Sequence, residues 1–268
     1  MLDKERISNI NHNYMSIHAA NILSVQVSKI SLQELLHKIS SIIDTRERAI
    51  ITHVHVMGLN IAYETKWFRD FLNNSTLVYC DGMGVKLGSI LLNDFLPNRF
   101  TLADWFDDLA HLAETHQYSL FFLGNPPGVA KIAVEKIQHK YPDLKIAGTY
   151  HGFFDKNIDS IENKTVIKMI NQAKPDILLV GFGMPTQEAW LAENWNQLDV
   201  YLAITCGALF EYVAEKLPRG PSWLTQNYLE WIVRIFISPR RYFLRYFKDN
   251  PKFIFRILKQ RFTGKDHL

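Results

Sequence analysis

The 268-residue chain is predicted to be an α/β protein, with a Rossmann-like, mostly parallel sheet covered by helices on both faces and a helical C-terminal appendage. Three observations predict this fold. Apolar runs of strand length alternate with segments whose apolar residues recur at helical spacing. Each run is apolar throughout, as expected of strands buried on both faces of a parallel sheet. After about residue 215 the alternation stops and a basic, aromatic-rich segment follows.

The strands are assigned to short apolar runs that carry little charge. They span 49–56, 76–80, 119–124, 144–150, 177–183 and 200–207. The helices are assigned where apolar residues recur three and four positions apart. They span 30–45, 61–72, 85–92, 102–116, 129–140, 158–173 and 187–196. Either Thr101 or Asp104 would cap the helix that begins at residue 102.

The C-terminal appendage begins with the connector LPRGPSW. One helix, 224–237, should end at Pro239, and two shorter helices should follow on either side of Pro251. Residues 216–268 carry 12 Lys/Arg, 3 Asp/Glu and 11 aromatic residues, whereas the first 215 residues have a net charge of −6. We therefore divide the chain into an α/β domain, 1–215, that should carry the chemistry, and an appendage, 216–268.

The charge of the appendage predicts contact with an anionic surface. A membrane interface places aromatic rings at the headgroups and arginines at lipid phosphates. Nucleic-acid binding uses the same mixture of residues, so composition alone leaves both partners open. We therefore expect the appendage to bind a polyanion, either a membrane surface or a nucleic acid.

The chain has the features of a cytoplasmic protein. No segment approaches the roughly 18–20 apolar residues of a spanning helix, and the N-terminal sequence MLDKERISNINHN lacks the apolar centre of a signal peptide. Cys80 and Cys206 lie in apolar runs and are predicted to be buried free thiols, which fits a reducing compartment.

Polar residues at the ends of the predicted strands are the candidate functional residues, because sites in parallel sheets lie at the carboxyl ends of the strands. Asp81 follows a buried strand in the sequence Cys-Asp-Gly-Met-Gly. A carboxylate there could act as a general base beside a ligand that approaches the glycines closely. The alternative is a helix N-cap, a position that suits aspartate.

Two loops join a strand to a helix and could bind phosphate or sugar. Gly124 opens the loop Gly-Asn-Pro-Pro-Gly, which could cradle a phosphate with its backbone N–H groups or be an ordinary turn. Gly181 and Gly183 precede Gln187 in the second loop. The Gln187 amide could bind a sugar or a base, or the loop could simply cap the next helix.

No metal site or cofactor is predicted. His53 and His55 share one face of a strand end, but no cysteine or carboxylate at ligand spacing accompanies them. The chain also lacks an Asp-x-Asp motif, so arginines would have to neutralise a diphosphate leaving group. The appendage arginines could do so, or could contact lipid phosphates instead; they are Arg219, Arg234, Arg240, Arg241 and Arg245.

Seven stretches together resemble the WecG/TagA/CpsF glycosyltransferases, glycosyltransferase family 26, over about residues 50 to 250. They are VYCDGMGVKLG, RFTLADW, LFFLGNPPGVA, YPDLKIAGTYHGFF, NQAKPDILLVGFGMPTQEAW, CGALFEYVAEKLPRGPSW and LEWIVRIFISPRRYFLRY. The combination of these motifs is specific, although each alone is weak.

The resemblance implies an inverting, metal-independent transfer of N-acetylmannosamine, a uronic acid or a related hexose from a UDP-sugar to a polyprenol-diphosphate-linked saccharide in bacterial cell-surface polysaccharide synthesis. It further implies a peripheral enzyme on the inner face of the cell membrane, with no nucleic-acid partner. A homo-oligomer is left open.

The resemblance also assigns functions to individual residues. Asp81 matches the proposed base, and Thr52 and Gln187 match other active-site positions. His55 stands where many relatives have asparagine, so it should touch a sugar. The remaining substrate contacts are expected at Asp104, Gly124, Gly181, Gly183, Arg219, Arg234 and Arg241.

Two other kinds of protein compete with this interpretation. A Rossmann-type oxidoreductase would need a G-x-G-x-x-G loop and a ribose-binding acid, which the chain lacks. In a non-catalytic membrane-binding or nucleic-acid-binding module, Asp81 and Gln187 would be structural and their substitution would leave function intact.

Overall fold

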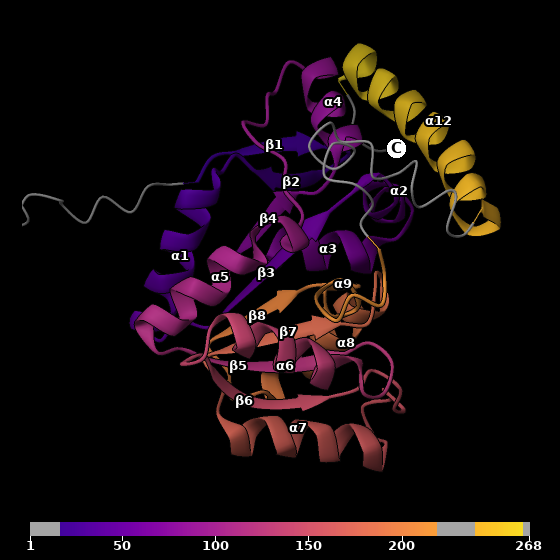
Figure 1. The fold of residues 1–268 in the computed structure, drawn as a ribbon. Coiled ribbons are helices and arrows are strands. Elements are labelled where there is room, and N and C mark those ends of the chain that lie inside the picture. The colour runs from indigo at the N-terminus through magenta and orange to yellow at the C-terminus, as the bar shows by residue number, and fades with distance from the viewer. Residues whose placement is uncertain (1–16, 219–238, 265–268) are drawn as a thin grey trace, which may run out of the picture.

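The computed structural model describes residues 17–218 and 239–264, with the backbone alone for 239–246. Figure 1 shows a parallel sheet between layers of helices, with a hairpin beside one end of the sheet and a long helix along the outside. The strands are β1 (Ala19–Ile22), β2 (Val25–Ser28), β3 (Ala49–Val54), β4 (Leu77–Cys80), β5 (Ser119–Gly124), β6 (Lys145–Tyr150), β7 (Ile177–Gly181) and β8 (Leu202–Thr205).

The helices alternate with these strands along the chain. They are α1 (Leu32–Asp44), α2 (Val56–Glu64), α3 (Lys66–Asn74), α4 (Met83–Leu91), α5 (Leu102–His116), α6 (Val129–Lys140), α7 (Ile161–Ala173), α8 (Thr186–Asn194), the 3-10 turn η1 (Trp195–Gln197), α9 (Leu209–Val213) and α12 (Pro239–Thr263).

The main sheet has the strand order β4-β3-β8-β7-β5-β6, and all neighbouring strands are parallel. The carboxyl ends of all six strands therefore lie along one edge. Strand β4, the next in the chain after β3, lies on one side of β3 at the edge of the sheet. Strand β8, the last of the six in the chain, lies on the other side of β3. This reversal of direction marks where α/β sheets bind ligands.

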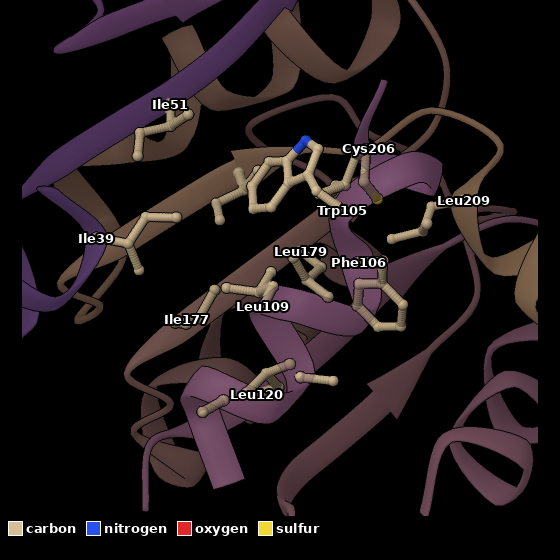
Figure 2. Packing of buried hydrophobic residues seen from close by; sticks show 14 of the residues in the cluster. Ile39, Ile51, Trp105, Phe106, Leu109, Leu120, Ile177, Leu179, Cys206 and Leu209 are labelled. Atoms are coloured by element: carbon tan, nitrogen blue, oxygen red, sulfur yellow. The ribbon is translucent and has the colours of Figure 1, made fainter. Parts of the chain in front are cut away.

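Two apolar cores cover the two faces of the sheet. Alternate residues of β7 point to opposite sides: Ile177 and Leu179 join one core, and Leu178 and Val180 join the other. Helices α1, α5, α6 and α9 cover the first face, where Trp105 packs among strand residues (Figure 2). Helices α2, α3, α7 and α8 cover the second. The predicted α/β fold with both faces covered is confirmed.

The prediction of a single helix over 61–72 was wrong. Two helices, α2 and α3, meet at Thr65, whose backbone is extended (φ −127°, ψ 107°). The buried residues explain the break. Leu59 and Ala62 lie on one side of a regular helix, whereas Phe68 and Leu72 would fall on the opposite side if that helix continued. The interruption turns the second apolar group back to the core.

The β1–β2 hairpin lies in the part of the sequence where no strand was predicted. Its two-residue turn consists of Leu23 and Ser24, both with positive φ, without the glycine or asparagine that usually marks such a turn. Four-residue strands also give too short an alternation to identify.

Two short helices split by Pro251 were expected, and this was wrong: α12 runs through the proline. Asn60 of α2 explains the continuity. Its Nδ2 donates to the Asp249 carbonyl (2.9 Å), and its Oδ1 accepts from Arg256 Nη1 (2.9 Å). Side-chain contacts on both sides of Pro251 thus hold the two halves in one line, although proline removes a backbone donor.

The long helix packs against the α/β domain. Phe253 and Ile257 are buried, and a Cβ on Gly88 of α4 would lie 2.7 Å from the Phe253 ring. Gln260 accepts from the Leu23 N–H (3.0 Å) and donates to the Asn21 carbonyl (3.0 Å), so α12 also joins the hairpin. None of the helices in the described residues is long and apolar enough to cross a bilayer.

Candidate active site

Asp81 lies at the carboxyl edge of the sheet, directly after β4. Its N–H still donates to the Val54 carbonyl of β3 (3.0 Å), which fixes the residue at the strand end. Its side chain is 20% exposed. The N-cap of α4 is Gly82, at φ +91°, rather than Asp81. The carboxylate is therefore held at the rim and still reaches solvent.

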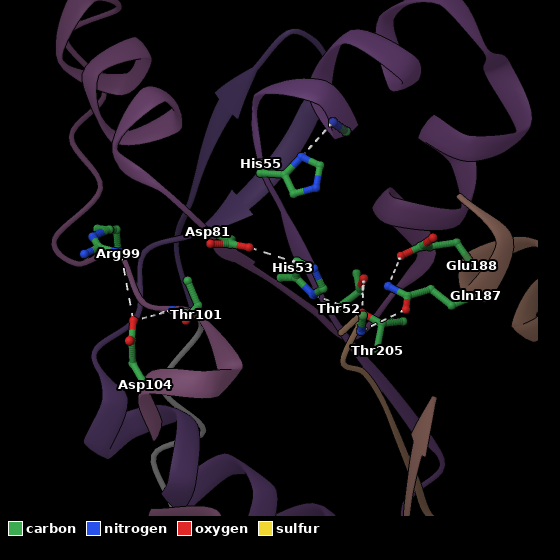
Figure 3. Close-up of polar contacts among 12 residues, drawn as sticks. Thr52, His53, His55, Asp81, Arg99, Thr101, Asp104, Gln187, Glu188 and Thr205 are labelled. Atoms are coloured by element: carbon green, nitrogen blue, oxygen red, sulfur yellow. Dashed lines mark hydrogen bonds and ion pairs between the residues drawn. The ribbon is translucent and has the colours of Figure 1, made fainter. Parts of the chain in front are cut away.

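Behind Asp81 lies a row of polar side chains from two neighbouring strands (Figure 3). His53 Nε2 is 4.0 Å from Asp81 Oδ2. His53 Nδ1 lies 3.3 Å from Thr205 Oγ1, which in turn lies 2.8 Å from Thr52 Oγ1. Both threonines are fully buried. The predicted active-site Thr52 thus stands at the inner end of a row that reaches the candidate base.

The His53 ring should be neutral, because burial lowers its pKa and outweighs the opposing effect of the Asp81 carboxylate. With its proton on Nε2, the ring would accept from Thr205 and direct its N–H toward Asp81. The separation of 4.0 Å exceeds a hydrogen bond, so a small rotation or a water would have to complete the contact.

His55 follows β3 and serves as the N-cap of α2, where its Nδ1 accepts from the Gly58 N–H (3.2 Å). The rings of His53 and His55 lie 6.2 Å apart. This places His55 at the same edge of the sheet as Asp81, and its contact with a sugar stays a prediction.

Gln187 is fully buried near the start of α8. Its Oε1 accepts from the Gly207 N–H (3.0 Å), and its Nε2 donates to Glu188 Oε1 (2.8 Å). Its amide therefore supports the loop after β8. A direct contact of Gln187 with substrate stays a prediction.

Glu188 is also fully buried, and its Oε2 has no hydrogen-bond partner within the part of the chain that the structure describes. Burial raises its pKa to about 7. The protonated carboxyl is therefore the favoured form below about pH 7, since an isolated charge would be costly there.

A cavity of about 750 Å³ opens at the carboxyl ends of β5, β6, β7 and β8. Its lining includes Gly181 and Gly183, two of the predicted binding residues, together with Thr186 at the start of α8. Gly183 has φ +80° and open space where a Cβ would stand. A ligand can therefore approach the backbone closely at this loop.

The floor of the cavity is held together by Asn125. Its Nδ2 donates to the carbonyls of Gly181 (2.6 Å) and Gly207 (2.9 Å), which joins the ends of three strands. Gly124 is buried next to it, and a Cβ there would lie 2.3 Å from the Gly181 carbonyl oxygen. Gly124 thus permits close packing of the strand ends and does not line the cavity.

Lys156 supplies a positive charge to the same cavity. Its Nζ lies 4.5 Å from the Phe154 ring centre and 4.6 Å from that of Phe182. Burial lowers its pKa. The ammonium also donates to the carbonyls of Gly152 (2.5 Å) and Phe154 (3.3 Å). Carbonyls and aromatic faces thus hold a cation at the wall of the cavity.

Asp104 and Arg99 lie beside the β4 end of the site (Figure 3). Asp104 Oδ2 accepts from the Thr101 N–H (3.0 Å), and Thr101 is the N-cap of α5. Arg99 Nη1 is 3.9 Å from the same carboxylate oxygen. In this arrangement Asp104 caps the helix and orients Arg99; its predicted contact with substrate stays a prediction.

The appendage arginines cannot be placed in the site. Arg219 and Arg234 lie outside the described residues, and Arg241 belongs to α12 without a described side chain. Across residues 17–218 and 239–264, no group of three His, Cys, Asp or Glu side chains is arranged to hold a metal ion. Cys80 and Cys206 are buried free thiols, as predicted.

Sequence reasoning missed several residues of the site. Thr205 gave no signal, because a threonine in an apolar run is typical of any strand. Lys156 and Arg99 stand in loops among ordinary surface charges. His53 was noted as a residue at a strand end and as a possible metal ligand, without a partner in Thr205. Thr205 and His53 come into contact because the strand order places β8 beside β3. The sequence does not reveal this order.

Comparisons with known proteins identify the family of the chain. Residues 20–267 match the family described as the glycosyl transferase WecG/TagA/CpsF family. The chain is 29% identical over 224 residues to the N-acetylglucosaminyldiphosphoundecaprenol N-acetyl-beta-D-mannosaminyltransferase of Bacillus subtilis (strain 168), covering 83% of this chain and 84% of that protein. The protein of the same name from Staphylococcus aureus (strain NCTC 8325 / PS 47) is 29% identical over 203 residues, 76% of this chain and 77% of its own. This chain belongs to the WecG/TagA/CpsF family and is a glycosyltransferase.

Proposed function

We propose that the enzyme transfers a hexose from a UDP-sugar to a saccharide linked to polyprenol diphosphate, with inversion at the anomeric carbon and without a metal ion. The names of the relatives support an acceptor of this class, since those proteins act on N-acetylglucosaminyl diphosphoundecaprenol. The donor would be N-acetylmannosamine, a uronic acid or a related sugar joined to UDP.

The observation that carries the proposal is a carboxylate at the sheet edge, open to solvent, with a histidine behind it. Asp81 would take the proton from the acceptor hydroxyl as the acceptor oxygen attacks the anomeric carbon. The bond from that carbon to the diphosphate breaks, and UDP leaves with the electron pair. Attack opposite the leaving group inverts the configuration.

The cavity over β5 to β8 is the candidate donor site. It has the volume of a small-molecule pocket, and glycines and a helix N-terminus line it. The base stands two strands away from β8, about 10 Å at the usual strand spacing. A nucleotide in the cavity could therefore extend its sugar across β8 and β3 toward Asp81.

The leaving diphosphate needs positive charge. Lys156 lies in the cavity, and the resemblance assigns the same function to Arg219, Arg234 and Arg241 of the appendage. Arginines can neutralise a diphosphate by paired hydrogen bonds. This would bring the appendage over the site during the reaction, next to an anionic membrane on its cytoplasmic side.

The test is UDP release by purified enzyme with a panel of UDP-sugars and a lipid-linked acceptor. Asp81→Asn should lower turnover by about 10²–10⁴-fold while binding of the UDP-sugar persists, because the amide keeps the size of the side chain but cannot take the proton. Asp108→Asn, at an exposed position of α5, is the control and should retain activity. Full turnover by the Asp81 variant would refute the assignment of the base.

A further inference from the structure

Helix α4 and the loop after it expose an unusual number of apolar side chains. Leu87, Ile90 and Leu91 project from one side of the helix, and Phe95 in the following loop is 61% exposed. The opposite side of α4 is buried through Val85 and other residues. A short helix that is apolar on both sides normally has a second surface to contact.

Helix α12 has a similar exposed stripe. Ile254, Phe255, Leu258 and Phe262 recur at helical spacing on the side away from the buried Phe253, and Phe262 is 82% exposed. Apolar side chains of this size are seldom so exposed to solvent on a helix that already buries its other face. The stripe is therefore a candidate contact surface as well.

The two helices lie side by side, because Gly88 of α4 is in contact with Phe253 and Ile257 of α12 (Figure 1). We define the α4–α12 apolar face by the exposed side chains of this pair. Its residues are Leu87, Ile90, Leu91, Phe95, Ile254, Phe255, Leu258 and Phe262. It combines a segment of the α/β domain with a segment of the appendage.

Charge identifies the occupant of this face. Residues 239–264 carry eight Lys/Arg and a single acidic residue. An anionic lipid interface accepts apolar side chains and attracts such a basic surround. A second copy of the chain is disfavoured, because a two-fold contact would oppose two strongly basic helices of the same sign.

We propose that the α4–α12 apolar face inserts into the headgroup region of an anionic bilayer, and that α4 is a membrane contact in its own right. This deepens the proposed function, on which it rests for the lipid-linked acceptor. Helix α4 begins two residues after Asp81 and extends about 12 Å to Leu91. The candidate base is thereby held within a helix length of the surface from which the acceptor projects.

The experiment measures binding of the full chain to phosphatidylcholine vesicles with and without phosphatidylglycerol, at low and high salt. The α4 variant combines Leu87→Ser, Leu91→Ser and Phe95→Ser. The control removes three exposed apolar side chains elsewhere: Trp67→Ser, Ile158→Ser and Ile161→Ser. We expect the α4 variant to bind anionic vesicles at least tenfold more weakly than the wild type at both salt concentrations, because apolar insertion is insensitive to screening.

The control should bind within about twofold of the wild type, since a few exposed side chains away from the membrane add little. A charge variant, Lys248→Gln with Lys259→Gln, should weaken binding at low salt only. Unchanged vesicle binding by the α4 variant would overturn the proposal, as would a loss of self-association in sedimentation velocity with vesicle binding intact. That second result would assign the face to another copy.

UDP release measured in detergent with a short-chain acceptor separates this proposal from the proposed function. We expect the α4 variant to turn over normally there, because none of its substitutions lies in the site. No turnover by any form of the enzyme, together with the expected vesicle results, would count against the proposed donor and acceptor alone. Normal turnover with unchanged vesicle binding would count against the membrane face alone.

Discussion

The site is built from short polar contacts between individual residues of neighbouring strands. Thr205 of β8 joins Thr52 and His53 of β3, and His53 faces Asp81 after β4. The three strands are neighbours in the sheet. The orientation of the candidate base therefore depends on side chains that need not touch a substrate.

Thr205→Val tests this dependence, because valine keeps the shape but removes the hydroxyl between Thr52 and His53. We expect kcat to fall about tenfold, the effect of one net hydrogen bond, with little change in KM. Thr205→Ser restores the hydroxyl and should recover most of the rate. Equal losses in the valine and serine variants would indicate a packing defect instead.

The raised pKa of Glu188 predicts that the stability of the folded protein depends on pH. Its pKa is about 7 in the folded protein against an ordinary value of 4.5. Between these values the folded chain holds a proton that the unfolded chain has released, so the free energy of unfolding falls as pH rises. The full loss, on the order of 3 kcal/mol, is reached above pH 7.

Glu188→Gln should remove this contribution. Urea denaturation at pH 4.5 and pH 7.5 should show a smaller difference in the variant than in the wild type. Because glutamine keeps an acceptor for Gln187 Nε2, the fold should persist. An identical pH difference in both proteins would contradict the assignment.

At the scale of elements, α12 is held by a few specific contacts. Asn60 contacts it on both sides of Pro251, and Arg256 and Lys252 both pair with Glu64 of α2. These ion pairs are partly exposed, so they should add little by themselves. The buried ring of Phe253 and the Asn60 amide should carry more of the docking energy.

Asn60→Ala should weaken the docking of α12 by about 1–3 kcal/mol, since it removes hydrogen bonds of a buried amide. Hydrogen exchange of the amides in 253–260 should quicken, while exchange in β7 stays unchanged. Uniformly faster exchange throughout the domain would show a general loss of stability rather than undocking.

The division of the chain into an α/β domain, 1–215, and an appendage, 216–268, stays a prediction. Deleting 216–268 should abolish both vesicle binding and transfer, because the basic helix and the appendage arginines would be lost together. Circular dichroism should still show the α/β domain. A truncated chain that sediments with anionic vesicles would contradict the assignment of the appendage.

The sequence predicts the sheet well because buried parallel strands leave a continuous apolar signal, and the strand ends then indicate Asp81 and the glycines of the cavity. It does not predict the Thr205–His53 pairing, since that requires the order β3-β8-β7 in space. The contacts that dock α12 were also hidden, because Asn60 lies nearly 200 residues from the helix residues that it contacts.

The contact of Gln260 with Asn21 and Leu23 joins segments nearly 240 residues apart. A ribosome that adds 5–20 residues per second completes the last strand several seconds before α12 has emerged. The sheet can thus form first, and the β1–β2 hairpin gains its contact with α12 only later. Nascent chains arrested after β8 should therefore carry a closed core and an open binding surface for α12, so this helix docks onto a sheet that has already formed.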